Sequence, residues 1–544
     1  MMRPILSALA ISALCACSPT TTTPTNGAAS SAAPEAMKDY APTGIIAKSL
    51  PEISDALANG ETTSATLVQT YLDRINEIDR AGPTLQAVLA VNPDAMKDAE
   101  ASDARRKDRK ALGPLDGVPI LVKDNVETAD PMATTAGALA LKDNVTGRDS
   151  PLIAGLRAQG AIILGKTNLS QWANFRSDRS MSGWSALGGQ VKNPHILDRN
   201  PCGSSSGSGA AMAASLAAGT VGTETNGSIT CPSNVNGIVG FKPTVGLVSQ
   251  QYVVPISFTQ DTPGPMTKTV KGAAMMLNAM ATGPAKTDYV AGLSADSLKG
   301  VRVGVARYAE GDNPAIKGLF EAALKTLSDA GAVLVDIKDF KPDEGVGAAE
   351  TTLLQTEFKS EINDYLANAA AAVQTRDLPS LIAFNKDHAD VELVLFDQSI
   401  FEASEKEGGL DGDDYKKALA TALKAAREDG VDKLMKDNNV DVLVAPSGPV
   451  APRVDPINGD VWPDFPGIGD LAAIAGYPHL TVPMGTVREM PVGISFVGTK
   501  DEDAKILSYG YAYEQASRLR TEPHYLPNAE AIPEIAAAMK RKSE

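Results

Sequence analysis

The chain has 544 residues, of which 43% are hydrophobic and 21% are charged. This composition is typical of a globular protein and excludes a chain that is disordered throughout, a collagen-like repeat and a small disulfide scaffold. With 50 basic and 66 acidic residues the formal net charge is −16. A surface this acidic repels phosphate backbones, so we expect no nucleic-acid partner.

The N-terminal residues predict an export signal. Arg3 supplies a positive start, residues 5–14 are apolar, and Leu14-Cys15-Ala16 precedes Cys17. An apolar stretch this short indicates a signal peptide rather than a transmembrane helix. Small residues directly before a cysteine resemble the lipobox of bacterial lipoproteins. We therefore expect residues 1–16 to be removed and Cys17 to be lipidated, with a plain secretory signal as the alternative.

Residues 17–42 are rich in Thr, Ala, Ser and Pro. Such a segment buries too little apolar surface to fold, so we predict a flexible tether. The expected location is outside the cytoplasm, on a bacterial membrane that faces the periplasm or the cell exterior. The membrane would then be contacted only through the lipid anchor, and the alternative is a soluble secreted protein.

Two further cysteines, Cys202 and Cys231, lie in the part expected to fold. An oxidising compartment allows such a pair to bond, but the pairing depends on a geometry that the sequence does not show. We expect free thiols.

Residues 43–530 are predicted to form the folded domain. In residues 64–78, Leu67, Tyr71 and Ile75 share one helical face, with Ser64 as the N-cap. Further helices are predicted over residues 151–158, 210–216 and 314–330. Short apolar runs predict strands over residues 118–122, 161–165, 238–241, 301–305, 333–335, 442–444 and 479–482, the last two ending at proline.

The alternation of these elements predicts an α/β fold in a single large domain. Its central sheet should be mixed and mostly parallel, with helices covering both faces. Residues 531–544 are predicted to form a C-terminal tail, partly as a short exposed helix.

The stretch 188–246 is dense in Gly and Ser and carries the candidate chemistry. Glycines between regular elements indicate positive φ angles or close approaches. Residues 203–209 precede a helix and could bind phosphate, but they lack the Lys-Ser/Thr ending of a P-loop. Ser205 stands at the centre of a G-x-S-x-G match, as in α/β-hydrolase esterases. A Ser-rich loop produces that match easily, so a Ser205 esterase is kept only as an alternative.

Several motifs taken together resemble the amidase signature family, and each of them alone is weak. They are residues 203–207 (GSSSG), 222–229 (GTETNGSI) with Pro232, 117–125 (GVPILVKDN), 163–168 (ILGKTN), 240–244 (GFKPT) and 476–478 (GYP). The resemblance covers roughly residues 45–520 and is nearest to bacterial peptide-amidase-like members.

The resemblance implies a Ser-Ser-Lys catalytic triad. Ser228 corresponds to the nucleophile, Ser204 to a bridging serine after a cis peptide with Gly203, and Lys123 to the base. This chemistry is also coherent from the residues alone, because a serine needs an adjacent base and burial favours the neutral form of a lysine. Lys123 follows the apolar run 118–122, which would carry it into the interior.

Backbone N–H groups would form the oxyanion hole and two side chains would support the site. The oxyanion residues are Thr225, Asn226, Gly227 and Ser228, and the supporting residues are Ser205 and Glu224. Three positions depart from the commonest family pattern: Glu224 replaces Asp, Asn226 replaces Gly, and Thr230 replaces Arg. Asn tolerates a positive φ better than most residues, so we expect the loop to keep its conformation.

The function expected from the resemblance is hydrolysis of a linear amide through an acyl-enzyme. The substrate would be a peptide C-terminal amide, an aryl amide or another small amide. We expect no cofactor, no metal ion and no obligate protein partner, since no Cys/His cluster has metal-ligand spacing.

Two alternatives lie outside this activity. An amidotransferase component that acts with tRNA conflicts with the export signal and the acidity. A non-catalytic, lipid-anchored binding protein on an amidase fold conflicts with the presence of Lys123, Ser204 and Ser228 together.

Other polar residues near the motifs are expected to be structural. They are Lys166, Lys242, Asp124, Asn125, His479 and Asp261, the last as a turn residue near the pocket. The pocket itself is expected within residues 252–258 and 340–402.

Overall fold

Eleven strands form one mixed sheet in the computed structural model, which describes residues 40–541. The strand order is β1-β3-β2-β6-β8-β7-β12-β13-β11-β9-β10. The strands are Val88–Val91 (β1), Pro119–Lys123 (β2), Ile162–Thr167 (β3), Gly219–Glu224 (β6), Val239–Lys242 (β7), Thr262–Thr267 (β8), Arg302–Ala306 (β9), Val333–Ile337 (β10), Val442–Pro446 (β11), His479–Val487 (β12) and Met490–Val497 (β13). Two short strands, Trp184–Ser185 (β4) and Gly189–Gln190 (β5), pair separately. Residues 1–16, Cys17 and the tether up to residue 39 lie outside the described residues.

Parallel pairing occurs in two blocks of the sheet, β3-β2-β6 and β11-β9-β10. The strands between these blocks, and β1 at the edge, pair in antiparallel fashion. The predicted α/β class and the mixed sheet are confirmed. Within the antiparallel part, β12 and β13 are joined by a short turn that leaves no room for a parallel crossover.

The prediction for β12 was wrong at its end. Pro483 does not stop the strand, which continues to Val487 and returns as β13. The turn between them is formed by Arg488 and Glu489, both with positive φ. Such two-residue turns match the twist of antiparallel strands, so the hairpin extends beyond the proline.

Helices cover both faces of the sheet. They are Leu50–Ala58 (α1), Ser64–Arg74 (α2), Ala95–Lys107 (α3), Pro151–Ala158 (α4), Ser206–Ala213 (α5), Thr230–Asn236 (α6), Val270–Met280 (α7), Pro314–Asp329 (α8), Val346–Ala367 (α9), Leu378–Asp387 (α10), Ala389–Glu392 (α11), Ser399–Ser404 (α12), Asp413–Ala426 (α13), Asp432–Asn438 (α14), Gly469–Ala475 (α15), Asp503–Ser517 (α16) and Pro533–Met539 (α17). On β6, the Thr220 hydroxyl donates to a carbonyl of α5, whereas Gly219 faces Met276 of α7 on the opposite side. The predicted two-sided covering is therefore confirmed.

Two helix starts differ from the sequence prediction. Thr63, not Ser64, caps α2, because its side chain accepts the N–H of Thr66 while the Ser64 hydroxyl donates to Gly117 O. Helix α5 begins at Ser206 rather than residue 210. Its serines and glycines are poor helix formers, but the whole helix is buried, and tertiary packing overrides such propensities.

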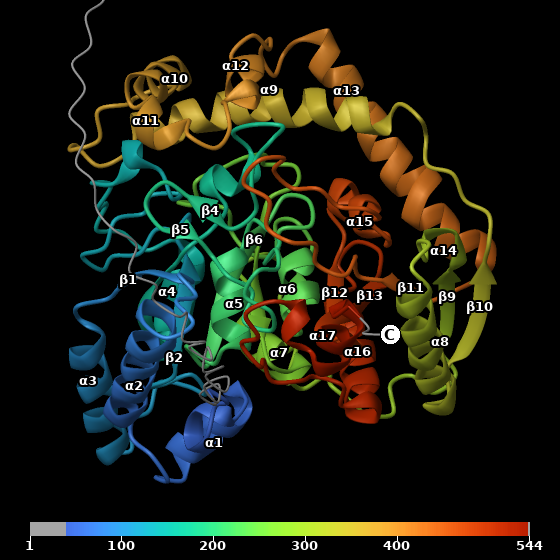
Figure 1. Ribbon diagram of the computed structural model, residues 1–544, viewed down its shortest axis with the longest axis horizontal. Helices are drawn as coiled ribbons and strands as arrows, with labels where there is room; N and C mark the ends of the chain where they lie inside the picture. Colours follow the sequence, from blue (N-terminus) through green and yellow to red (C-terminus); the bar gives the residue numbers. More distant parts are fainter. Residues whose placement is uncertain (1–39, 542–544) are drawn as a thin grey trace, which may run out of the picture. The chain divides into compact units, whose positions relative to one another are not determined.

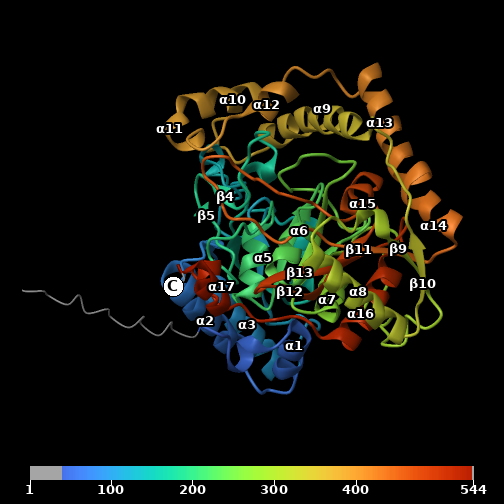
Figure 2. The ribbon, with the colours of Figure 1, turned by 45° about the vertical axis from the view of Figure 1, so that its right-hand side comes forward.

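Helices α9, α10, α12 and α13 lie together in a layer along the top of the molecule as it is drawn in Figures 1 and 2. Trp172, Phe358 and Phe401 pack there through aromatic contacts. This layer places residues of α9 next to the loop after β6, as the site shows below.

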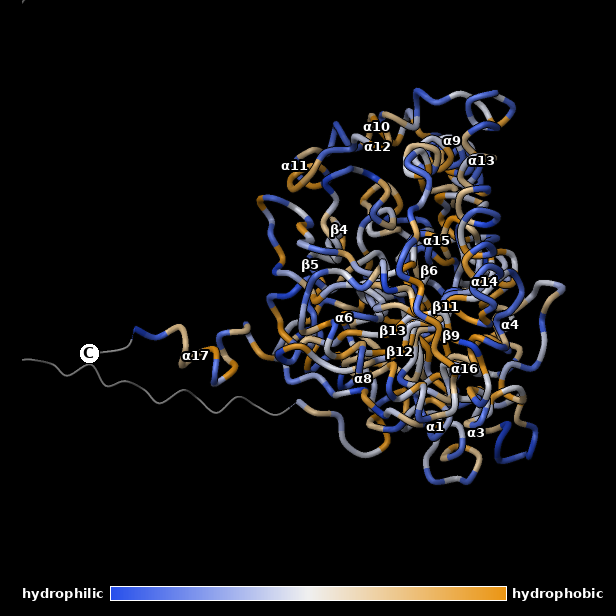
Figure 3. Tube along the Cα trace, turned by 90° about the vertical axis from the view of Figure 1, so that its right-hand side faces the viewer, coloured by the Kyte–Doolittle hydropathy of each residue, from blue (hydrophilic) through white to orange (hydrophobic). Residues whose placement is uncertain are grey.

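Apolar backbone stretches gather around β9, β11, β12 and β13, and polar stretches predominate in the outer loops (Figure 3). Within residues 40–541, none of the helices is long and apolar enough to cross a bilayer.

Candidate active site

Lys123 is the last residue of β2 and its side chain is completely buried. Its Nζ donates to Ser204 Oγ and to Thr223 Oγ1, each at 2.8 Å. Burial lowers the pKa of Lys123 to about 7, although Asp261 and Glu224 act to raise it. A large share of this amine is therefore neutral near pH 7 and can accept a proton.

Two loops bring the candidate serines together. The Gly203–Ser204 peptide is cis, as the resemblance implied, and Ser228 lies in the loop between β6 and α6. The N–H of Ser205 donates to Ser228 O at 3.1 Å and joins the two loops. Among the described residues no hydrogen bond joins the hydroxyls of Ser204 and Ser228 directly. Ser204 is fully buried, whereas Ser228 is 8% exposed.

Thr223 was missed by sequence reasoning and connects most of the site. Its hydroxyl accepts from Lys123 and, at 3.0 Å, from Asn125 Nδ2. Its carbonyl accepts from Ser205 Oγ at 3.1 Å, and the supporting role of Ser205 stays a prediction. Because β2 and β6 are parallel neighbours, their carboxyl ends meet at one edge, and this adjacency positions Thr223 beside Lys123.

The oxyanion loop, residues 225–228, takes its left-handed conformation at Gly227, whose φ is 78°. Asn226 has no positive φ, so the expected reason for tolerating asparagine there was wrong. Its side chain instead donates to Glu350 Oε1 of α9 at 2.9 Å. A Cβ built on Gly227 would meet nothing within 4 Å, so the loop faces open space.

Glu224 and Thr230, two of the departures from the family pattern, contact each other. Glu224 Oε2 accepts from the N–H groups of Ile229 and Thr230 at 2.7 and 2.9 Å, and from the Thr230 hydroxyl at 3.2 Å. Both residues are buried. One oxygen of the carboxylate therefore caps the start of α6 with help from the threonine hydroxyl, and the buried amines of Lys123 and Lys242 interact with its charge.

Asp261 holds the oxyanion loop from the other side and is more than a turn residue. Its Oδ1 accepts from the Thr225 hydroxyl at 2.5 Å, and its Oδ2 accepts from the N–H groups of Ile256 and Ser257. Burial raises the pKa of Asp261 to about 6. Gln260 donates to Thr225 O and to Glu350 Oε1, at 3.3 and 3.0 Å. These contacts give the loop a fixed shape.

One cavity is lined by the oxyanion loop, and a second lies beside Asp261. One, of about 360 Å³, is lined by the loop itself and by residues 465–470, including Phe465 and Asp470. The other, of about 330 Å³, is lined by Asp261, Tyr252, Glu361 and Asp364 among others. The second cavity is lined by residues of both segments in which a pocket was expected, 252–258 and 340–402. The wall at 465–470 was not anticipated, because nothing in its sequence marks it.

A sequence profile of the amidase family matches residues 66–507. The chain belongs to the amidase family. The amidase is 36% identical to a probable amidase of Arabidopsis thaliana over 498 residues, which cover 88% of this chain and 91% of the relative. The native peptide amidase of Stenotrophomonas maltophilia has 43% sequence identity and a TM-score of 0.83, covering 88% of this chain and 98% of that chain.

The amidase is also similar to one component of a larger enzyme. A glutamyl-tRNA(Gln) amidotransferase component of Thermoanaerobacter pseudethanolicus is 30% identical over 499 residues, covering 88% of this chain and 98% of the relative. The expected family, fold class and enzyme class are confirmed by these similarities together with the sheet.

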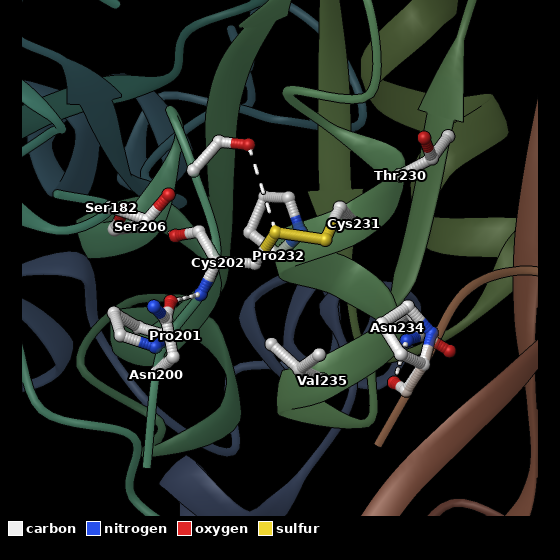
Figure 4. The surroundings of a disulfide bond; sticks show 12 residues. Ser182, Asn200, Pro201, Cys202, Ser206, Thr230, Cys231, Pro232, Asn234 and Val235 are labelled. Carbon is white, nitrogen blue, oxygen red and sulfur yellow. Dashed lines mark hydrogen bonds between the residues drawn. A yellow bond between two sulfur atoms is a disulfide. The ribbon is translucent and has the colours of Figure 1, made fainter. Parts of the chain in front are cut away.

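The amidase contains a disulfide between Cys202 and Cys231, so the expectation of free thiols was wrong. The fold places the two Cα atoms 5.9 Å apart, within the range that a disulfide spans. Figure 4 shows the bond between the segment before Ser204 and the first turn of α6. The 29-residue separation in sequence hid this proximity.

The remaining polar residues of the amidase core are buried and paired. Lys166 Nζ donates to Val126 O at 2.5 Å and to Thr134 Oγ1 at 2.8 Å, and His479 Nε2 lies 2.6 Å from the Ser495 hydroxyl. Burial lowers the pKa of Lys242 to about 8 and raises that of Asp124 to about 6. Within residues 40–541, no group of three or more His, Cys, Asp or Glu side chains could hold a metal ion.

Proposed function

We propose that this amidase hydrolyses the C-terminal carboxamide of a peptide, or another small linear amide, through an acyl-enzyme on Ser228. The contact of 2.8 Å between Lys123 Nζ and Ser204 Oγ carries the proposal. A fully buried lysine with a lowered pKa, in contact with a serine beside a second serine loop, is a base for nucleophilic catalysis. The similarity to a peptide amidase supports the substrate class.

The proton moves along the two serines in this mechanism. Neutral Lys123 takes the proton of Ser204, and Ser204 takes the proton of Ser228, whose Oγ attacks the amide carbonyl carbon. Backbone N–H groups of residues 225–228 stabilise the negative oxygen, each worth about 2.7–4 kcal/mol. The C–N bond then breaks as the relay returns a proton to the leaving nitrogen. Water releases the acid from Ser228 by the same steps.

Acidic side chains outnumber basic ones around the two cavities and favour a substrate with a positive charge. Asp470 lines the first cavity, and Asp261, Glu361 and Asp364 line the second together with Arg148. Glu361, Asp364 and Asp470 have no ion-pair partner among the described residues, and neither has Glu350, which contacts the loop but lines neither cavity. Burial raises the pKa of Glu361 to about 8 and also raises the pKa of Glu350 and Asp470. Glu350 and Glu361 are partly buried, whereas Asp364 and Asp470 are exposed. A bound ammonium or guanidinium group favours the charged form of the partly buried carboxyls. We therefore include a cationic group near the amide in the proposed substrate.

A serine-directed phosphonate or sulfonyl probe tests the nucleophile. We expect the probe to label Ser228, as determined by peptide mapping of the adduct. Labelling at Ser205 with Ser228 unmodified would contradict the site and support the esterase alternative. No labelling and no turnover of simple amides would support a non-catalytic binding protein.

Matched peptide amides test the substrate class. Dipeptide amides that differ only in a lysine, norleucine or glutamate side chain should rank in that order by kcat/KM, with no ATP and no partner added. Asp470→Asn should reduce the preference for lysine over norleucine by about fivefold to tenfold. Glu100→Gln removes the same charge from an exposed position of α3 and should leave the preference unchanged. A strict need for glutamine, ATP and tRNA would instead identify an amidotransferase component.

We also propose that the enzyme works outside the cytoplasm, anchored by a lipid on Cys17, with residues 43–530 as the catalytic domain. The lipobox-like sequence before Cys17 supports this location. The Cys202–Cys231 disulfide supports it independently, because such bonds persist in oxidising compartments.

A further inference from the structure

The disulfide closes a loop that contains the catalytic serines. Cys202 stands two residues before Ser204, and Cys231 stands three residues after Ser228. The enclosed residues therefore include Thr223 and the whole oxyanion loop. Lys123 lies outside the closed loop, on a strand of the sheet.

The segment around Cys202 has an unfavourable backbone conformation that its contacts hold in place. Cys202 has a φ of 54°, which a residue other than glycine rarely adopts. Its N–H donates to Asn200 Oδ1 at 2.8 Å, and its carbonyl accepts from Ser206 Oγ at 2.5 Å. Figure 4 shows these neighbours around the bond. The disulfide adds a covalent tie to the side chain of the same residue.

Several hydrogen bonds join the two serine-bearing segments besides the disulfide. The N–H of Ser205 donates to Ser228 O, Ser205 Oγ donates to Thr223 O at 3.1 Å, and Asn236 Nδ2 donates to Pro201 O at 3.1 Å. Ser204 and Ser228 have no direct hydrogen bond among the described residues, so their spacing depends on the backbones that carry them. Cys231 also lines the cavity beside the oxyanion loop.

We propose that the Cys202–Cys231 disulfide positions Ser228 against Ser204, so that the chemical step requires the bond and not only a folded protein. The inference rests on the proposed function of Ser228. The two cysteines do not touch the reacting atoms and act through the segments that carry the serines. Misplacing a reacting group by about 1 Å can cost on the order of 100-fold in rate.

Reduction of the native enzyme gives the direct test. A phosphine reductant donates two electrons to the disulfide, two thiols form, and water supplies the oxygen of the phosphine oxide. We expect the reduced protein to keep its circular dichroism spectrum while phosphonate labelling of Ser228 slows at least tenfold. For an amide substrate, kcat should fall by a similar factor with little change in KM. Reoxidation with a small disulfide reagent should restore labelling in proportion to the fraction of protein in which the Cys202–Cys231 bond has re-formed. Alkylation mapping of the two cysteines measures that fraction.

Variants separate positioning from stability. The double variant Cys202→Ser/Cys231→Ser should label slowly at a temperature well below its unfolding midpoint. Val235→Ala is the matched control, because Val235 is fully buried in the same apolar cluster as both cysteines. It should lower the unfolding midpoint and keep the labelling rate within about twofold of the native rate.

The outcomes distinguish this inference from the proposed function. Reduced and oxidised enzyme that label Ser228 at equal rates would overturn the positioning role. A reduced enzyme that loses labelling only together with its circular dichroism signal would also overturn it, because the bond would then serve stability alone. An oxidised enzyme that never labels Ser228 would instead contradict the proposed function.

Discussion

In the proposed mechanism, the protonation state of Lys123 determines when the site can react. Burial leaves the Lys123 amine with a pKa of about 7. Among the described residues no carboxylate bonds to this amine, and its two hydroxyl partners do not neutralise a positive charge. A free lysine would be almost fully protonated at this pH. The strand that buries Lys123 therefore also activates it.

The first prediction concerns pH. The reactive form is neutral Lys123, so kcat/KM should fall about tenfold for each pH unit below 7 and become level above about pH 8. Activity is lost on the acid side of the profile, because protonation of Lys123 removes the base. The measurement is a pH–rate profile with a neutral amide whose own charge does not change. A profile that rises only above pH 10 would contradict the lowered pKa.

Replacement of Lys123 tests the same group by mutation. Lys123→Ala should reduce kcat about 10³-fold, within the range for a lost general base, while the unfolding midpoint stays within a few degrees. Steady-state kinetics and thermal unfolding are the two measurements. Turnover close to the native rate would exclude the Lys–Ser relay.

Thr223 gives a residue prediction that the sequence did not supply. Thr223→Val removes the hydroxyl that accepts from both Lys123 and Asn125. We expect kcat to fall about tenfold because the amine loses one of its two hydroxyl partners and its orientation toward Ser204. Thr223→Ser keeps the hydroxyl and should recover most of the rate. A loss of rate in Thr223→Ser with none in Thr223→Val would show that the methyl group, not the hydroxyl, matters.

The sequence predicted individual site residues where they belong to local motifs and failed where distant segments meet. Ser204 and Lys123 were identified and lie in contact. Glu350 and Gln260 were not, because each reaches the oxyanion loop from its own segment and neither is marked by its neighbours in sequence. The disulfide was mispredicted for the same reason.

At the scale of elements, the oxyanion loop leads directly into α6. Glu224 accepts hydrogen bonds from the backbone N–H groups at the start of that helix. One carboxylate oxygen satisfies two N–H groups and one hydroxyl. The two departures from the family pattern, Glu224 and Thr230, thus form one hydrogen-bonded arrangement rather than two unrelated changes.

This arrangement leads to a stability prediction. Glu224→Ala should lower the free energy of unfolding by about 3 kcal/mol, since it leaves buried donors without an acceptor. Thr230→Val removes one hydrogen bond and should cost about 1 kcal/mol. Urea denaturation of both variants measures the difference. A larger loss in Thr230→Val than in Glu224→Ala would show that the carboxylate is not the cap.

Most strands of the large sheet followed from hydrophobic periodicity but only a minority of the helices did, of which α4 has the predicted bounds. Helix α5 departed from prediction because its burial compensates for weak helix formers. The strand order could not be predicted, since β8 reaches β6 and β7 only through contacts far apart in the chain.

At the scale of the whole molecule, we propose that the N-terminal segment determines where the enzyme works. The lipid-anchor proposal gives a direct prediction: Cys17 is the mature N-terminus and carries acyl chains. The intact mass of membrane-extracted protein should show the loss of residues 1–16 and the added acyl mass. Cys17→Ser should move the enzyme out of the membrane fraction. A soluble mature chain that starts elsewhere, without acyl mass, would contradict the anchor.

The acidic cavity walls also affect what happens after catalysis. Hydrolysis converts a neutral amide into a carboxylic acid, which ionises once it reaches water. Asp470 lines the cavity beside the oxyanion loop, and Glu350 contacts that loop. A newly formed carboxylate is therefore repelled by both side chains. We therefore expect weak product inhibition by the acid. The charges that attract a cationic amide thus also speed the release of the acid product.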